Sequence, residues 1–134
     1  MAHTAGSVPL AALPERFARR GVFYPMQTFT RGREVDFGEI PVFIEASSPA
    51  LCDELEAFAR RLSRTVIRSD SAQRAKVHLA AVFACNFANR MYALGERIAR
   101  DAGLDFGVLK PLVTETAAKA RDARSPLDAQ TGPA

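Results

Sequence analysis

The sequence predicts an α/β segment followed by an all-α segment, and three observations support this fold class. Two short β-rich runs flank one amphipathic helix pattern in the first half of the chain, and a long run without proline follows them. The chain has 134 residues, of which 48% are apolar and 25% are charged. That composition is typical of a globular domain and excludes a disordered or disulfide-dense chain. The length suits one ordinary domain and is short for a complete two-domain enzyme.

Short strands and turns are expected before residue 47. An apolar run that opens with Gly21 is interrupted by Pro25, so a strand should end near that proline. A second run alternates so that Val42 and Ile44 share one face of a strand. The expected elements are at most a helical turn or two over 8–14, a strand over 21–26, a polar turn over 30–33 and a strand over 40–45.

A helix and a third strand should follow. Ser48 can cap a helix, and Pro49 is tolerated at its first position. Apolar residues then recur at spacings of four, three and four, which predicts one helical stripe: Leu51, Leu55, Phe58 and Leu62. Residues 65–68 form a short β-branched strand pattern. Strand, helix and strand in this order predict a crossover that joins two strands of one sheet.

The second half of the chain predicts a long helix over residues 71–102. Asp70 and Gln73 have the spacing of a capping box, and proline is absent throughout this range. Gly103 supplies a left-handed stop. A second helix should run from Asp105 to about residue 121, and Pro111 should kink or restart it. The tail over 124–134 is expected to be a loop.

The middle of the long helix is apolar on every face over residues 79–85, so it is expected to be buried all round. Asn86 and Asn89 directly after it are therefore unusual, because a buried amide needs partners for its donors and its acceptor. Two readings stay open. Either the amides form hydrogen bonds with backbone groups of a neighbouring helix or a dimer mate, or they face a cleft and bind a polar ligand.

Two further polar residues lie near the start of this helix. His78 is interpreted either as a core or interface histidine whose ring nitrogens are hydrogen-bonded, or as a ligand-binding group. Lys76 reads either as a solvated amine or as a group that polarises a carbonyl. A lysine and an asparagine on one helix beside a sheet could polarise a carbonyl and orient a hydroxyl, as hydride transfer requires.

Several functional classes find little support. The net charge is +3, and basic residues alternate with acidic ones, so nucleic-acid binding is not expected. Cys52 and Cys85 have no metal-ligand spacing around them and read as reduced core thiols. No metal cluster, glycine-rich dinucleotide turn or membrane-length apolar run occurs in the sequence. The first residues lack the features of a signal peptide, and a cytoplasmic location is expected.

Three motifs, in order along the chain, carry a resemblance to a known family: YPMQTFT over 24–30, SAQRAKVHLAAVFACNF over 71–87 and AQTGPA over 129–134. The chain resembles a bacterial two-domain group in which a Rossmann-like NAD(P)-binding domain, of the type found in deazaflavin-dependent NADP reductases, precedes a helical domain of unknown function. More distantly, it is similar to prephenate dehydrogenases, ketopantoate reductases and 6-phosphogluconate dehydrogenases. In those relatives a long-helix domain dimerises and closes the substrate cleft over the nicotinamide.

The resemblance implies a domain organisation and a set of partners. Residues 1–69 would be the last strands of a Rossmann-like sheet, and residues 70–134 an incomplete helical substrate and dimerisation domain of the 6-phosphogluconate dehydrogenase C-terminal type. The chain would be a fragment that lacks the glycine-rich amino-terminal part and the carboxyl-terminal end. The parent protein would bind NADP or NAD and a small-molecule substrate, and would dimerise through the long helix. This chain alone is expected to bind no cofactor tightly.

The resemblance also implies roles for individual residues. The segment His3–Ser7 matches the family's segment after a late Rossmann strand, whereas Tyr24 departs from the family, which usually has His there. The resulting hypothesis is the substrate and dimerisation portion of an NAD(P)-dependent oxidoreductase, and the alternative is a non-catalytic helical dimerisation or binding module. The assigned residues are Lys76 and Asn86 for catalysis, Gln27, Thr28, His78 and Asn89 for substrate, and His3 and Gly6 for cofactor.

Overall fold

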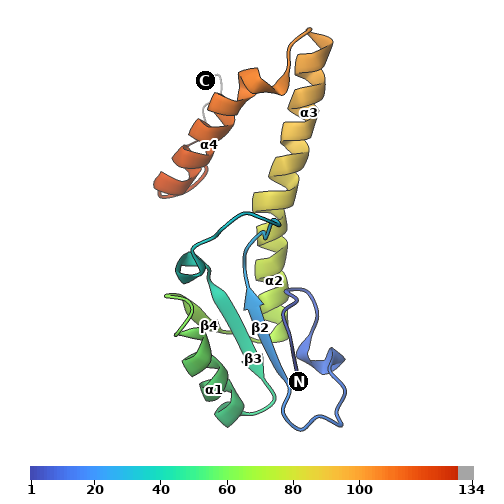
Figure 1. Ribbon diagram of the computed structural model, residues 1–134, viewed down its shortest axis with the longest axis vertical. Coiled ribbons are helices and arrows are strands. Elements are labelled where there is room, and N and C mark those ends of the chain that lie inside the picture. The colour runs from blue at the N-terminus through green and yellow to red at the C-terminus, as the bar shows by residue number, and fades with distance from the viewer. Residues whose placement is uncertain (130–134) are drawn as a thin grey trace. The chain divides into compact units, whose positions relative to one another are not determined.

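The computed structural model describes residues 1–129, and the chain divides into two compact units, Met1–Phe87 and Ala88–Ala134. The first unit is built around a four-stranded sheet with strand order β1-β2-β3-β4 (Figure 1). Pairing is parallel between β1 and β2, antiparallel between β2 and β3, and parallel between β3 and β4. The strands are β1 (Ala2–His3), β2 (Gly21–Pro25), β3 (Val42–Ala46) and β4 (Val66–Arg68).

The predicted crossover is confirmed. Helix α1 (Pro49–Ala59) connects β3 to the parallel strand β4. The Ser48 side chain accepts a hydrogen bond from the Leu51 backbone N–H, so the expected cap is present. Residues 8–14 contain only the single 3-10 turn η1 (Leu10–Ala12), because Pro14 cannot continue a helix. Strand β1, which is two residues long, had no sequence signal.

Hydrophobic clusters lie on both faces of the sheet. On one face α1 covers Val42 and Ile44, which share a side as predicted. On the other face Val22, Tyr24 and Phe43 form the second cluster. Partly buried residues from η1 and from helix α2 pack on this second cluster, namely Leu10 and Val77. The two faces therefore have separate environments, an α1 side and an α2 side.

The stripe predicted for α1 is partly wrong. Leu51 is buried and Leu55 packs on the core, but Phe58 and Leu62 are exposed. Ala59 is the fully buried residue at the end of the helix instead. The reason is that α1 ends at Ala59, so the fourth position of the expected stripe falls in the turn that follows. Phe58 still contacts the ring of Phe23, with centroids 5.7 Å apart.

The long helical run is interrupted by a π-helical turn. Helices α2 (Ser71–Val82) and α3 (Ala88–Asp101) are joined by the π-turn η3 (Phe83–Phe87). The predicted cap is confirmed, because the Asp70 side chain accepts a hydrogen bond of 2.7 Å from the Gln73 N–H. The stop at Gly103 is also confirmed, since its φ of 76° lies in the left-handed region.

The expectation that the apolar middle of the helix is buried all round is wrong. The exposed fractions are 56% for Leu79, 60% for Phe83 and 47% for Phe87. In the first unit, the side of α2 that packs on the rest of the unit is the side that carries Arg74, Val77 and His78. A helix can rest on a sheet along one stripe only, so an apolar pattern on every side leaves apolar residues exposed.

The second unit contains α3, the 3-10 turn η4 (Phe106–Leu109) and α4 (Lys110–Asp122). Asp105 caps η4 by accepting from the Gly107 N–H. Pro111 lies in the first turn of α4, so the predicted restart of the helix is confirmed. Residues 124–129 form turns, as expected for the start of the tail. Most of the third motif, residues 130–134, lies outside the described residues.

The fold class, α/β followed by helices, is confirmed. The division into compact units falls between Phe87 and Ala88 because the first turns of α2 pack on the sheet unit. The domain boundary between residues 69 and 70 stays a prediction, as it concerns a longer protein. Among residues 1–129, no helix combines the length and apolar content that crossing a membrane needs.

Candidate functional site

Polar side chains gather on the α2 side of the sheet. In the strand register His3 pairs with Val22, and Val22 pairs with Glu45. Paired residues on adjacent strands point to the same side, so these three share one face of the sheet. Tyr24 is on this face too, two residues after Val22 on β2. The α2 side therefore combines a histidine, a tyrosine and a carboxylate with the residues that α2 presents.

Tyr24 and His78 are the central pair of this site. The Tyr24 hydroxyl lies 3.1 Å from His78 Nδ1, and the two rings meet edge-on with centroids 5.9 Å apart. Tyr24 is only 9% exposed, whereas His78 is half-buried. Burial raises the pKa of the Tyr24 phenol, because an apolar environment disfavours the phenolate. The pair thus couples a protonated phenol to an imidazole.

Gly6 covers this pair. A Cβ at position 6 would lie 2.7 Å from His78 Nδ1 and 2.7 Å from Tyr24 Cζ. Side chains essentially never approach so closely, so the position is restricted to glycine by packing. Gly6 is buried, and the segment that follows β1 runs directly over the tyrosine and the imidazole.

His3 precedes this segment on β1. Its Nδ1 accepts a hydrogen bond of 3.2 Å from the Ala5 backbone N–H. Its other ring nitrogen, Nε2, is buried and has no partner among residues 1–129. In a neutral ring Nδ1 is then the acceptor, so Nε2 carries the hydrogen and is an unused buried donor.

Arg74 anchors the same segment to α2. Its side chain is fully buried, forms an ion pair with Glu45 of β3 and donates a 2.7 Å hydrogen bond to the Val8 carbonyl. Ser71 adds to the anchor, because its hydroxyl donates to Glu45 and accepts a 3.0 Å bond from the Leu10 N–H. The segment 8–10 is therefore tied to both α2 and β3, two residues after Gly6.

Sequence reasoning did not find Arg74 or Glu45. The helical periodicity contained a signal for Arg74, and the strand periodicity contained one for Glu45. Arg74 is four residues before His78 and hence on the same face of the helix. Glu45 is two residues after Phe43, so it shares the inward face of the strand. An inward-facing charge on each of two neighbouring elements predicts an ion pair.

The structure places the other predicted residues apart from this pair. Gln27 and Thr28 are exposed after β2, where the Gln27 Oε1 accepts a 2.8 Å hydrogen bond from the Thr28 N–H. Lys76 is exposed on α2 and points roughly 200° away from His78 around the helix axis. Asn86 is exposed within the π-turn η3. Asn89 is exposed and belongs to the second unit.

The two predicted catalytic residues are far apart along their helix. Ten residues separate Lys76 from Asn86, which corresponds to about 15 Å at the rise of an α-helix. One small carbonyl group cannot contact both side chains over that span. Their roles stay predictions, and if both act they must contact different parts of a substrate.

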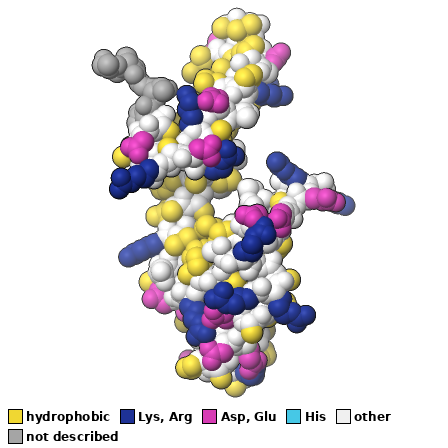
Figure 2. All heavy atoms as spheres, turned by 90° about the vertical axis from the view of Figure 1, so that its left-hand side faces the viewer, with side chains coloured by type: hydrophobic (Ala, Val, Ile, Leu, Met, Phe, Trp, Pro, Cys, Tyr) yellow, Lys and Arg dark blue, Asp and Glu magenta, His cyan; other side chains and the backbone are white. Residues whose placement is uncertain are grey.

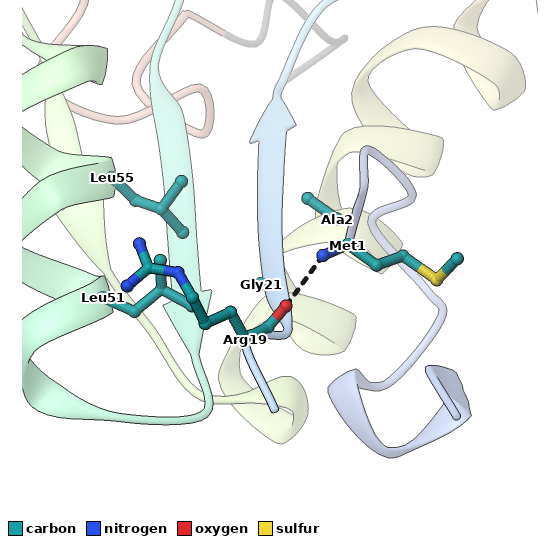
Figure 3. A pocket seen from close by; sticks show the side chains of 6 residues that line it. All are labelled: Met1, Ala2, Arg19, Gly21, Leu51 and Leu55. Carbon is teal, nitrogen blue, oxygen red and sulfur yellow. Dashed lines mark hydrogen bonds between the residues drawn. The ribbon is translucent and has the colours of Figure 1, made fainter. Parts of the chain in front are cut away.

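A pocket of about 220 Å³ lies on the α1 side, as Figure 3 shows. The Met1 amino group donates a 2.7 Å hydrogen bond to the Arg19 carbonyl beside it. The Arg19 guanidinium is paired with Glu54. The pocket is lined by Met1, Ala2, Arg19, Gly21, Leu51 and Leu55. This largely apolar lining contains no histidine, tyrosine or carboxylate side chain, in contrast to the Tyr24–His78 pair.

Surface charges and potential metal ligands are the other groups that could form a functional site. Acidic and basic side chains are interspersed over the face shown in Figure 2. Many charged side chains of the first unit are paired, as Arg68 is with Asp53 and Glu56. Within the described part of the chain, no group of three or more His, Cys, Asp or Glu side chains could hold a metal ion. The candidate site is therefore the Tyr24–His78 pair with the segment over it.

Comparison with known proteins identifies the family. Residues 40–134 match the family described as a domain of unknown function, DUF2520. The chain belongs to this family. The DUF2520 match includes β3, α1, β4 and all of the long helical run. No curated protein matches the chain.

Two solved structures resemble this DUF2520 chain. The first is the putative NADP oxidoreductase BF3122 from Bacteroides fragilis, with 52% sequence identity and a TM-score of 0.89 over 99% of this chain. The second is protein TM1727 from Thermotoga maritima, with 22% identity and a TM-score of 0.83 over 98% of this chain, a likeness of fold. The chain spans about half the length of these proteins, 51% and 53% respectively.

The residues assigned to a nucleotide do not form an NADP site by themselves. A glycine that admits a phosphate must leave open space, whereas the space beside Gly6 is filled by Tyr24 and His78. The buried Nε2 of His3 is a single donor, and one donor does not hold a dinucleotide. A glycine-rich turn would hold a dinucleotide, but the 134 residues contain no such turn.

Proposed function

We propose that this chain is the substrate-side and dimerisation portion of an NADP- or NAD-dependent oxidoreductase. The observation that carries the proposal is the 52% identity, over 99% of this chain, to a protein named as a putative NADP oxidoreductase. The reaction is a hydride transfer between nicotinamide and a small carbonyl compound, hydroxy acid or imine. The strands of the first unit are then the last strands of a Rossmann-like sheet, and the nucleotide is held by the part of a longer protein that this chain does not span.

The residues of this chain bind and orient the substrate in this proposal. His78, whose imidazole contacts Tyr24 and lies under Gly6, binds a polar group of the substrate. Gln27 and Thr28, which follow β2, bind polar groups of the substrate. Lys76 and Asn86 keep the roles that the sequence suggested, a polarising ammonium and an orienting amide, each at its own end of the substrate. Asn89 keeps the substrate-binding role that the sequence suggested.

Nucleotide titration tests the proposal. We expect the 134-residue chain alone to show no measurable NADPH affinity, since it has no glycine-rich turn. A fusion protein in which this chain replaces its counterpart in the Bacteroides fragilis protein should bind NADPH and oxidise it with a carbonyl substrate. Tight NADPH binding by the chain alone, or a folded fusion protein that neither binds nor oxidises NADPH, would overturn the proposal.

A second function is favoured by a different observation. The exposed Leu79, Phe83 and Phe87 offer an apolar strip on the helix, and the rings of Phe83 and Phe87 stack with centroids 4.7 Å apart. Such a strip suits a non-catalytic helical dimerisation or binding module. Substitution of Lys76 or Asn86 by Ala in the fusion protein separates the two functions. Unchanged turnover with lower stability favours the module and removes the catalytic roles.

A further inference from the structure

We propose that His78 is the group that exchanges a proton with the substrate oxygen, and that Tyr24 is the residue that positions its imidazole. The inference rests on the proposed function and deepens it. The sequence suggested His78 only as a substrate contact and assigned catalysis to Lys76 and Asn86. The structure offers instead a coupled pair on the α2 side of the sheet.

Tyr24 fixes the orientation of the His78 imidazole. Tyr24 on β2 engages Nδ1 of the imidazole at 3.1 Å, and the edge-on ring contact restricts rotation of the side chain. A histidine has two ring nitrogens, so Nε2 is the one left for a substrate. His78 is half-buried while Tyr24 is almost fully buried, and thus the imidazole is the member of the pair that a ligand can reach.

The hydroxyl of Tyr24 suits the role of the positioning group. The Tyr24 hydroxyl can accept a hydrogen bond from Nδ1–H of the imidazolium and from Nδ1–H of the neutral tautomer whose Nε2 carries no hydrogen. Tyr24 can therefore hold His78 in both protonation states. Burial raises the pKa of Tyr24, so the phenol keeps its proton while the imidazole changes charge.

The proposed step balances as follows for reduction. A reduced nicotinamide, when bound, would supply the hydride that forms the new C–H bond and would itself be oxidised, while the C=O π electrons move to oxygen. That oxygen takes the proton from His78 Nε2 and becomes a hydroxyl. The imidazolium becomes a neutral imidazole that keeps its Nδ1 hydrogen bonded to Tyr24, and it regains a proton from water. Oxidation of an alcohol runs through the same atoms in reverse.

The residues around Tyr24 and His78 support the pair. Gly6 leaves no room between the segment after β1 and the two rings. The charged or titratable groups on this side of the sheet are Tyr24, His3 on β1, and the ion pair of Glu45 with Arg74. Glu45 and Arg74 neutralise each other. Of these groups, Tyr24 is the one in hydrogen-bond contact with the His78 imidazole.

Turnover of the fusion protein tests the catalytic claim. We expect His78→Gln to lower kcat/KM by about 10²–10⁴-fold, the usual contribution of general acid–base catalysis, and to abolish one limb of its pH profile. Tyr24→Phe should lower kcat/KM by at least ~10-fold and shift that limb. The matched control is Tyr92→Phe, the other tyrosine of the chain, which should change neither the rate nor the profile.

A spectroscopic measurement on the 134-residue chain tests the positioning claim independently of activity. The ¹⁵N shifts of the neutral His78 ring should show a hydrogen on Nδ1, donated to the Tyr24 hydroxyl, and an Nε2 without a hydrogen. In Tyr24→Phe the shifts should indicate a mixture of tautomers. Unchanged shifts in that variant would overturn the role of Tyr24.

The outcomes separate this inference from the proposed function. If the folded fusion protein oxidises NADPH and His78→Gln stays within about threefold of the parent rate, the inference is wrong and the proposed function stands. If the fusion protein neither binds nor oxidises NADPH, the proposed function is wrong, and the proton-transfer role of His78 falls with it.

Discussion

The fully buried Arg74 side chain on α2 forms an ion pair with the largely buried Glu45 on β3, and the same guanidinium donates a hydrogen bond to the Val8 carbonyl. This contact joins α2, β3 and the segment that runs over His78. A buried charge needs a partner, because desolvation costs several kcal/mol per ion in a protein interior. The pair therefore holds this segment in place, together with the Ser71 hydroxyl that accepts from the Leu10 N–H.

Removal of Arg74 should be strongly destabilising. Arg74→Met leaves the Glu45 carboxylate uncompensated, and we expect the free energy of unfolding to fall by about 3–5 kcal/mol. Urea denaturation followed by circular dichroism measures the change. The double variant Arg74→Met, Glu45→Gln should recover part of the loss. The control is Arg64→Met, whose exposed pairs with Asp36 and Glu39 should contribute about 1 kcal/mol at most. Equal losses for Arg74 and Arg64 would contradict the buried anchor.

Gly6 and Gly95 should respond to alanine in opposite directions. A Cβ at Gly6 would overlap His78 and Tyr24 at 2.7 Å, so Gly6→Ala should lower the free energy of unfolding by about 1–3 kcal/mol through overpacking. A Cβ at Gly95, inside α3, would meet Leu109 at an ordinary 3.5 Å. Gly95→Ala should stabilise the protein by roughly 0.5–1 kcal/mol, because alanine is the better helix former. A neutral Gly6→Ala variant would show that the segment over the pair is free to move.

The raised pKa of Tyr24 predicts a loss of stability in alkali. Burial disfavours the phenolate, so the folded state binds the phenolic proton more tightly than the unfolded chain does. The resulting stabilisation is complete below the ordinary tyrosine pKa of about 10 and is lost as the pH rises from there through the folded-state value. Urea denaturation between pH 8 and pH 11 should show this decline, and Tyr24→Phe should reduce its slope. An identical slope in both proteins would contradict the buried phenol.

Local chemistry explains which parts of the fold could be predicted from the sequence. The caps at Ser48 and Asp70, the stop at Gly103 and the restart at Pro111 each depend on residues within a few positions of one another. The alternation of Val42 and Ile44 depends on one strand. These features were predicted, and the structure confirms them.

The candidate site could not be predicted in the same way, because it depends on contacts that are distant in sequence. Tyr24 and His78 are 54 positions apart, and Glu45 and Arg74 are 29 positions apart. Periodicity places Arg74 and Glu45 on inward faces, but it does not indicate that Tyr24 will meet His78. The sequence did point to Gly6 and His78 through the family resemblance, but for a nucleotide and a substrate respectively rather than for contact with each other.

The long helix shows a second limit. Its apolar composition over residues 79–85 predicted burial, but the sequence alone could not say which faces are covered. The π-turn η3 also had no sequence signal, and it changes which residues share a face beyond Val82. Leu79, Phe83 and Phe87 are exposed because the helix packs on the sheet along one stripe only.

The exposed strip leads to a final prediction about self-association. If the chain dimerises through the long helix, as the sequence resemblance implies, Phe83→Glu should place a charge in the apolar contact and abolish the dimer. Because Phe83 is 60% exposed, the stability of the monomer should change by only about 0.5 kcal/mol. Light scattering over a range of concentrations measures the mass, and circular dichroism shows whether the fold is retained. Exposed Phe58 on α1 supplies the control, since Phe58→Glu places the same charge on another helix and should leave the mass unchanged. A dimer that survives Phe83→Glu would exclude this strip as the interface.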